Sequence, residues 1–148
     1  MNFKNVNWLA ILLSLVACMG IGFLWYGGLF MDQWMAANGI TLGEGGETMI
    51  KNGVEMPPSA TPMIVNTIAM IIYALFMHWL LERSNSFTLK GGSTTGLTLG
   101  VILYIGIVLN NMFAMTPYDL TMIDGSYAVV LWTVIGTIIG AWPKKNKA

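Results

Sequence analysis

Residues 125–143 read GSYAVVLWTVIGTIIGAWP, an apolar stretch that runs from Asp124 to Lys144 without a charged side chain. A helix of about 20 residues crosses the roughly 30 Å hydrocarbon core of a bilayer. Three further uncharged windows of at least this length lie between Lys4 and Asp32, between Glu55 and Glu82, and between Lys90 and Asp119. Because backbone groups in lipid must bond within their own segment, each window predicts a transmembrane helix.

The window boundaries predict a single domain over residues 1–148. Pro62 suits the first turn of a helix, and Pro117 separates the third window from the fourth. The predicted fold class is all-α: a polytopic bundle of four transmembrane helices with a long loop, residues 31–60, between the first two. We expect the helices near residues 7–30, 61–82, 93–115 and 121–142.

The composition excludes several other classes of protein. Of the 148 residues, 55% are hydrophobic and 9% are charged, with seven basic residues against seven acidic ones. Ordinary globular domains carry about 25% charged residues, so a water-facing surface is not expected. A nucleic-acid binder needs a basic face, and a disulfide scaffold needs more than one cysteine. We therefore expect the lipid bilayer as a partner and no nucleic acid.

The basic residues indicate how the helices are oriented. Lys51 lies on one side of a four-pass topology, and the six others lie on the opposite side: Lys4, Arg83, Lys90, Lys144, Lys145 and Lys147. Cytoplasmic flanks of membrane helices retain positive charge. Both termini are therefore predicted to be cytoplasmic, which places the loop of residues 31–60 on the outer side.

Small residues form stripes on the predicted helices. Gly125, Gly136 and Gly140 share one side of the fourth helix, and Gly96 and Gly100 share one side of the third. Association in lipid relies on close backbone approach through such residues. Two interpretations stay open: packing within one chain, and an interface between copies of the chain.

Polar and aromatic side chains gather at the predicted outer end of the bundle. They are Trp25 and Tyr26 at the end of the first helix, Asn66 near the start of the second, Asn110 and Asn111 near the end of the third, and Asp124 and Tyr127 in the fourth. An ionised carboxylate near the hydrocarbon boundary needs a partner or water. The layer is interpreted either as a structural polar clamp or as a site for a ligand or ion.

The loop of residues 31–60 is long for a compact domain. Residues 31–37 predict a short amphipathic helical turn at the membrane interface, and Asn52-Gly53 predicts a turn between short β-prone arms. The loop is either a lid over the polar layer or a simple cover. Its acidic residues favour cations over anions on this side.

Three segments resemble the bacterial membrane family called domain of unknown function 1761. They are Asn7-Trp8-Leu9-Ala10, then Leu24-Trp25-Tyr26-Gly27, and Ile123-Asp124-Gly125-x-Tyr127. The resemblance spans the whole chain and implies a four-pass protein of a bacterial cytoplasmic membrane, with no established activity. It also implies that five residues of the outer layer matter: Trp25, Tyr26, Trp34, Asp124 and Tyr127.

Catalysis has few residues to use. The single histidine, His78, is interpreted as an interfacial residue near a helix end, and Cys18 lies on another helix without an evident partner. We therefore expect no enzyme, no cofactor and no resident metal. The function predicted first is non-catalytic binding or assembly, with a second copy or another membrane protein as the partner.

Two alternatives stay open. The first is transport of a small solute or cation by a homo-oligomer. The second is copper(I) binding, since thioethers select this ion and eight methionines lie on or near the outer side: Met31, Met35, Met49, Met56, Met63, Met112, Met115 and Met122.

Overall fold

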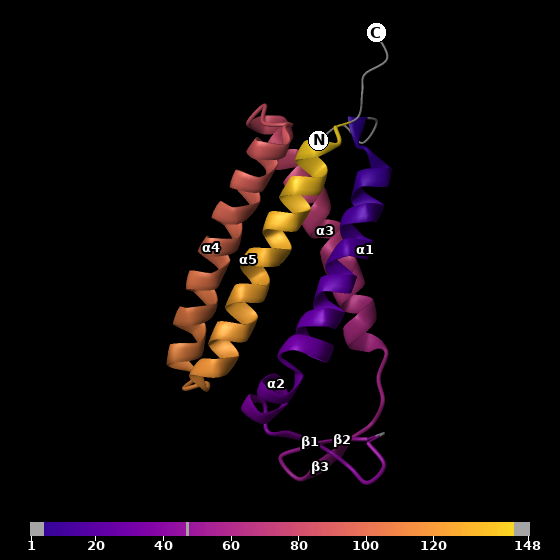
Figure 1. Cartoon of the computed structure of the whole chain (residues 1–148), viewed down its shortest axis with the longest axis vertical. Helices are drawn as coiled ribbons and strands as arrows, with labels where there is room; N and C mark the ends of the chain where they lie inside the picture. The colour runs from indigo at the N-terminus through magenta and orange to yellow at the C-terminus, as the bar shows by residue number, and fades with distance from the viewer. Residues whose placement is uncertain (1–4, 47, 144–148) are drawn as a thin grey trace.

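The computed structural model describes residues 5–46 and 48–143 and is mostly helical (Figure 1). Its elements in chain order are α1 (Trp8–Leu24), a π-helical turn η2 (Trp25–Leu29), α2 (Met31–Ala37), β1 (Ile40–Leu42), β2 (Met49–Lys51), β3 (Val54–Met56), α3 (Thr61–Arg83), α4 (Leu89–Phe113) and α5 (Tyr118–Ala141). Among the described residues, four helices are long and apolar enough to cross a membrane: α1 continued by η2, then α3, α4 and α5. The four predicted helices are thus confirmed, although α4 and α5 begin a few residues earlier than predicted.

Asn7 joins the beginning of α1 to the end of α5. Its Oδ1 accepts hydrogen bonds from the backbone N–H groups of Leu9 and Ala10, at 3.2 and 3.4 Å, and so caps the helix. Its Nδ2 donates to the backbone oxygen of Trp142 at 2.9 Å. The first and last long helices therefore meet at one end of the bundle, at the top of Figure 1.

Helix α5 is the centre of the bundle, because it contacts α1, α3 and α4. Its side chains Leu131, Trp132, Ile135 and Ile139 form the hydrophobic core with Val6, Ile11 and Cys18 near or on α1 and with Met70, Ala74, Met77 and Leu81 on α3. The Trp132 ring lies 5.0 Å from that of Tyr73 and 6.2 Å from that of Phe76, centroid to centroid. One side of α5 is thereby filled by α1 and α3.

The other side of α5 receives α4 through glycines. A Cβ atom added to Gly96 would collide with the backbone oxygen of Trp132, and one added to Gly100 would lie 2.6 Å from the Cα of Val129. Gly136 and Gly140 of α5 face α4 in the same way, against the backbone of Gly92. Gly92 is a further member of this contact, one that lies outside the predicted helix of residues 93–115.

Two hydrogen bonds brace this glycine contact. The Ser93 and Thr137 hydroxyls lie 2.8 Å apart, and Asn111 Nδ2 donates to Thr121 Oγ1 at 2.9 Å near the opposite ends of the helices. Side-chain hydrogen bonds and small residues are the two main means of holding helices together in lipid. Helices α4 and α5 therefore form a tight antiparallel pair (Figure 1).

The loop before α3 adds a small sheet to the predicted helical bundle. Its helical turn, α2, and its hairpin, β2 with β3, are confirmed, but β1 adds a third antiparallel strand beside β2. Gly39 and Gly53 have φ of 65° and 80°, a conformation that glycine adopts without strain and that these tight turns require. The sheet lies beyond the end of the bundle, next to α2 (Figure 1).

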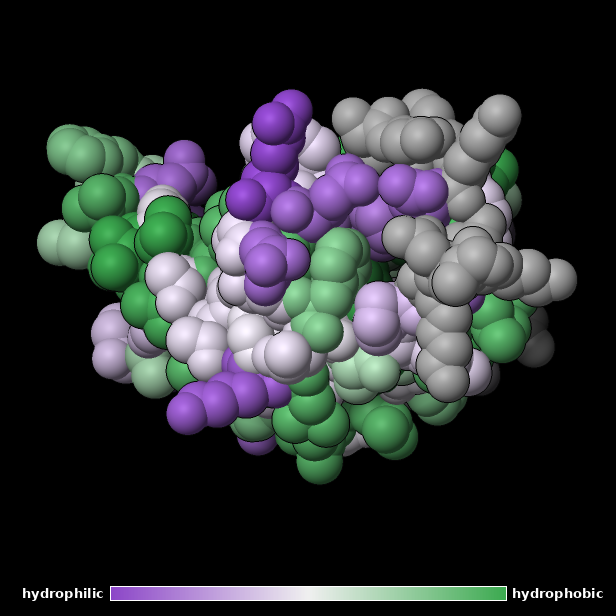
Figure 2. Space-filling view, turned by 90° about the horizontal axis from the view of Figure 1, so that it is seen from above, coloured by the Kyte–Doolittle hydropathy of each residue, from purple (hydrophilic) through white to green (hydrophobic). Residues whose placement is uncertain are grey.

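Polar residues cover the end of the bundle where α1 begins. Figure 2 looks onto this end and shows hydrophilic residues gathered there, with hydrophobic residues around the sides. Arg83, Ser84, Asn85 and Lys90 are exposed in and beside the turn between α3 and α4. The prediction of cytoplasmic termini also relied on four basic residues that lie outside the described residues: Lys4, Lys144, Lys145 and Lys147.

The glycine contact generates a first prediction. Gly96→Ala places a methyl group against the α5 backbone and forces the two helices apart, so the free energy of unfolding falls by about 1–3 kcal/mol. Gly20→Ala is the matched control, because a Cβ atom at Gly20 on α1 meets nothing within 4 Å. Unfolding in mixed detergent micelles measures both variants, and equal stability of the two would contradict the proposed contact.

Candidate functional site

The π-helical turn at the end of the first spanning helix builds the candidate site. The N–H of Phe30 donates to the carbonyl of Trp25, five residues back, at 2.9 Å. Gly27 and Gly28 lie within this turn and carry no side chain to crowd its wider backbone. Such turns recur at functional sites because they redirect side chains. Here the turn directs Trp25 and Tyr26 toward α5.

Two hydrogen bonds join this turn to α5. Tyr26 donates its hydroxyl hydrogen to Asp124 Oδ1 at 3.0 Å, and Trp25 Nε1 donates to the carbonyl oxygen of Ile123 at 3.1 Å. Both side chains come from one helical turn, and both acceptors are consecutive residues of α5. The half-buried Asp124 carboxylate therefore has a partner within the chain, as a polar group near the hydrocarbon boundary requires.

Aromatic rings enclose these hydrogen bonds. The Tyr26 ring lies edge-on to Trp34 of α2 at 5.7 Å and to Tyr127 of α5 at 5.0 Å, and Trp25 lies 6.2 Å from Tyr127. Edge-to-face contacts of this length are favourable by about 0.5–1.5 kcal/mol each. We call Trp25, Tyr26, Trp34, Asp124 and Tyr127 the aromatic clamp. It fixes η2, α2 and α5 relative to one another.

The structure does not bring the asparagines into the clamp. Asn66 on α3 and Asn110 on α4 are exposed. Asn110 Nδ2 donates to Asn111 Oδ1 at 3.4 Å, and Asn111 bonds to Thr121 near the start of α5. The expected single polar layer is therefore divided, because α4 is held against α5 by its glycines and lies apart from η2.

Three members of the site were not among the predicted site residues. The Phe30 ring lies tilted against that of Trp25 with 5.0 Å between the ring centroids, and the Ile123 carbonyl accepts a hydrogen bond from Trp25 Nε1. Phe30 carries a detectable signal, since it is an aromatic residue one turn after Trp25. The carbonyl carries none, because backbone acceptors have no sequence signature. Gly22 also belongs to the site: a Cβ atom there would lie 3.1 Å from the Tyr127 hydroxyl oxygen.

The predicted packing glycines lie in two places. Gly96, Gly100, Gly136 and Gly140 make the α4–α5 contact, whereas Gly125 faces the ring of Tyr104. The Tyr104 hydroxyl in turn lies 3.0 Å from the sulfur of Met122. Gly125, which directly follows the clamp residue Asp124 in the chain, thus lies against the Tyr104 side chain of α4.

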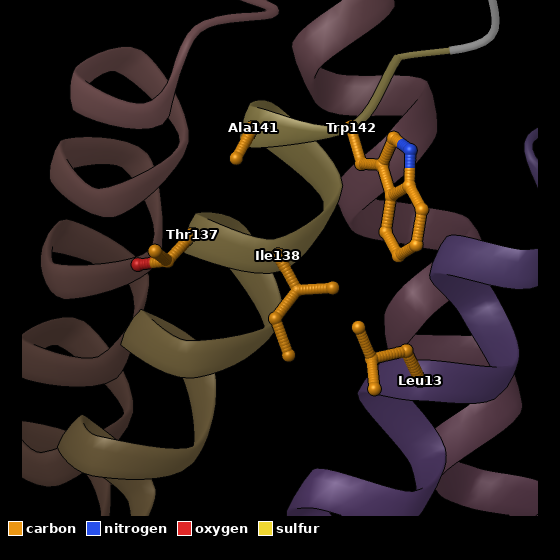
Figure 3. A pocket seen from close by; sticks show the side chains of 5 residues that line it. All are labelled: Leu13, Thr137, Ile138, Ala141 and Trp142. Atoms are coloured by element: carbon orange, nitrogen blue, oxygen red, sulfur yellow. The ribbon is translucent and has the colours of Figure 1, made fainter.

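Shallow grooves on the bundle are apolar. The groove in Figure 3, about 470 Å³, lies between α1 and α5, where Ile138 and Trp142 point toward Leu13. A second groove of about 360 Å³ lies on α3 beside Phe76 and Trp79. Neither lining offers a charged group, so these grooves suit hydrocarbon rather than a polar solute.

His78 lies near the end of α3 and is buried within the bundle. Its side chain is 3% exposed, its Nδ1 has no hydrogen-bond partner among the described residues, and its ring lies 5.1 Å from that of Phe87. Within residues 5–46 and 48–143, no three His, Cys, Asp or Glu side chains lie close enough to hold a metal ion. Copper(I) binding stays a prediction. Met49 and Met56 are direct cross-strand partners in the sheet, whereas Met35 is buried in α2.

Comparison with known families identifies the chain. Residues 9–140 match the family described as "Protein of unknown function (DUF1761)". The chain belongs to this family. Membership confirms the resemblance seen in the sequence, and all five clamp residues of this DUF1761 chain lie inside the matched range. Curated proteins gave no match, and neither did solved structures.

The clamp generates a second prediction. Tyr26→Phe removes the hydroxyl bonded to Asp124 and lowers the free energy of unfolding by about 0.5–1.5 kcal/mol. Asp124→Ala removes the acceptor, so the double variant loses less than the sum of the two single losses. Tyr118→Phe is the control, because Tyr118 is 72% exposed. Strict additivity of the two single effects would show that the hydrogen bond contributes nothing.

Proposed function

We propose that this DUF1761 protein is a non-catalytic assembly protein of the membrane, which docks onto another membrane-spanning helix through the outward side of α4. One observation carries the proposal: the residues buried within α4 (Leu89–Phe113) are Gly92, Gly96 and Gly100. Among the described residues, the larger side chains of this 25-residue helix are half-buried or exposed. Leu97 and Ile105, for example, are 47% and 54% exposed.

The outward side of α4 has a surface suited to a close helix contact. Thr98, Ile102 and Gly106 lie four residues apart in a row, and all three are exposed. A Cβ atom at Gly106 would meet nothing within 4 Å, so a neighbouring backbone can approach there. Apolar surface alone does not drive association in lipid, whereas small residues and hydroxyl groups do.

The aromatic clamp supports assembly over solute or cation transport. Tyr26 and Trp25 use their polar atoms on Asp124 and on the Ile123 carbonyl, and the clamp rings lie in contact with one another. The Tyr26 hydroxyl bonds to Asp124 Oδ1, so a transported cation would have to share the carboxylate with it. The clamp therefore fits the role of holding α2 and the attached sheet in a fixed place beside the end of the bundle where α5 begins.

A third prediction tests the assembly surface. Gly106→Leu fills the open position on α4 and shifts the protein from an assembled to a monomeric species, or releases a partner that co-purifies with the wild type. Gly20→Leu is the matched control, because Gly20 on α1 also has nothing within 4 Å. Native mass spectrometry from gentle detergent records both species. A wild-type protein that is monomeric and carries no partner overturns the proposal.

We also propose that the end of the bundle bearing Arg83 and Lys90 faces the cytoplasm of a bacterium and that the sheet lies outside. The support is the uneven distribution of basic residues: Arg83 and Lys90 flank the turn between α3 and α4, whereas Lys51 is the single basic residue of the described loop at the other end.

A fourth prediction tests this orientation. A membrane-impermeant maleimide added to intact cells or spheroplasts labels Glu44→Cys, whereas Ser84→Cys is labelled only after the membrane is opened. Both residues are exposed, and the native Cys18 is 1% exposed and so serves as the unlabelled background. Labelling of Ser84→Cys in closed cells would reverse the orientation.

A further inference from the structure

The three-stranded sheet has two chemically different faces. Its register pairs Leu42 with Met49 and Met49 with Met56 in one row, and Ile40 with Lys51 and Lys51 with Val54 in another. Partners and residues two apart in a strand share a face. Five apolar residues and one lysine therefore occupy one face, which we call the apolar face. The opposite face carries Thr41, Ile50 and Glu55.

The apolar face is exposed except at Ile40, which is half-buried. Leu42, Met49, Val54 and Met56 are 44%, 48%, 65% and 47% exposed. The strands have only three residues each, and a sheet gains stability when its hydrophobic face packs against another surface. The face is thus available to a surface other than the described residues of the chain.

Short connections keep the sheet beside the membrane. Residues 38–39 join α2 to β1, and residues 57–60, which include Pro57 and Pro58, join β3 to α3. A fully extended connection of the latter length reaches at most about 18 Å. The sheet therefore stays within reach of the headgroup layer in which the spanning helix α3 begins.

The charges of the two faces differ in sign. Lys51 lies on the apolar face, and Glu55 lies on the opposite one. A surface of lipid phosphates attracts the ammonium group and disfavours the carboxylate, so the two charges select the same orientation of the sheet. Long lysine side chains also keep their charged end in the headgroups while their methylene groups contact apolar surface.

We propose that the apolar face of the sheet rests on the lipid headgroup layer, with Leu42, Met49 and Met56 inserted and Lys51 paired with lipid phosphate. The area of the face favours lipid over a second copy of the chain. Three strands of three residues cover only about 10 Å by 14 Å, whereas a specific protein interface takes about 800 Å² from each partner. A lipid surface has no such minimum.

A fifth prediction tests this placement by fluorescence of single-cysteine variants labelled with an environment-sensitive dye. The full chain is reconstituted into nanodiscs of phosphatidylcholine and phosphatidylglycerol. Met49→Cys and Met56→Cys give blue-shifted emission that brominated lipid quenches, whereas Ile50→Cys and Glu55→Cys give emission that aqueous iodide quenches. Positions 49 and 50 are neighbours in β2 on opposite faces, which makes each the control for the other.

Two results would overturn the proposal. Equal iodide quenching at positions 49 and 50 would place both faces in water. Protection of position 49 from iodide without lipid quenching, lost as the protein is diluted in lipid, would assign the face to a second copy. Lys51→Glu is expected to reduce lipid quenching at position 49 in phosphatidylglycerol-containing discs, and thermal unfolding verifies that each variant is folded. The outcome is independent of the α4 surface and leaves the proposed assembly function unaffected.

Discussion

The close contact between the backbones of α4 and α5 is the constraint on which the rest of the bundle depends. Gly96 and Gly100 let α4 approach α5 so closely that a Cβ atom at either position would collide with the α5 backbone. Helix α5 consequently has its remaining surface free for α1 and α3, and this is where the large core residues such as Trp132 and Ile135 lie. Among the described residues, the same contact leaves α4 with exposed side chains such as Leu97 and Ile105 on the side away from α5.

A second constraint acts at the opposite side of α5, where the π-helical turn converts the end of a spanning helix into a clamp. Trp25 and Tyr26 are consecutive residues, yet both reach α5 because the wider turn carries an extra residue. Trp34 then attaches the short helix α2 to the same cluster. The loop on this side of the bundle is thus anchored by aromatic contacts rather than by its own small sheet.

The sequence predicts the helices well because charge placement in a membrane protein is a strong signal. The sequence also placed Trp25, Tyr26, Asp124 and Tyr127 at the same end of the bundle. The reason is that the first and fourth helices run in opposite directions, so the end of one lies beside the start of the other. The sequence also assigned Asn66 and Asn110 to this layer, although the structure places them away from the clamp. Sequence indicates how deep a residue lies in a membrane, but it does not indicate on which side of the bundle the residue lies. Strand β1 was missed because three residues carry too little alternation to be recognised.

The hydrogen bond from Asn7 to the backbone of Trp142 joins residues 135 positions apart. Because α1 precedes α5 in the chain, this hydrogen bond forms only after α5 has been synthesised. The Ser14 hydroxyl donates to the carbonyl of Ala10 at 2.8 Å within α1, so this polar group has a partner before the other helices are present. Assembly of the described bundle therefore depends on α5, the helix that all the others contact.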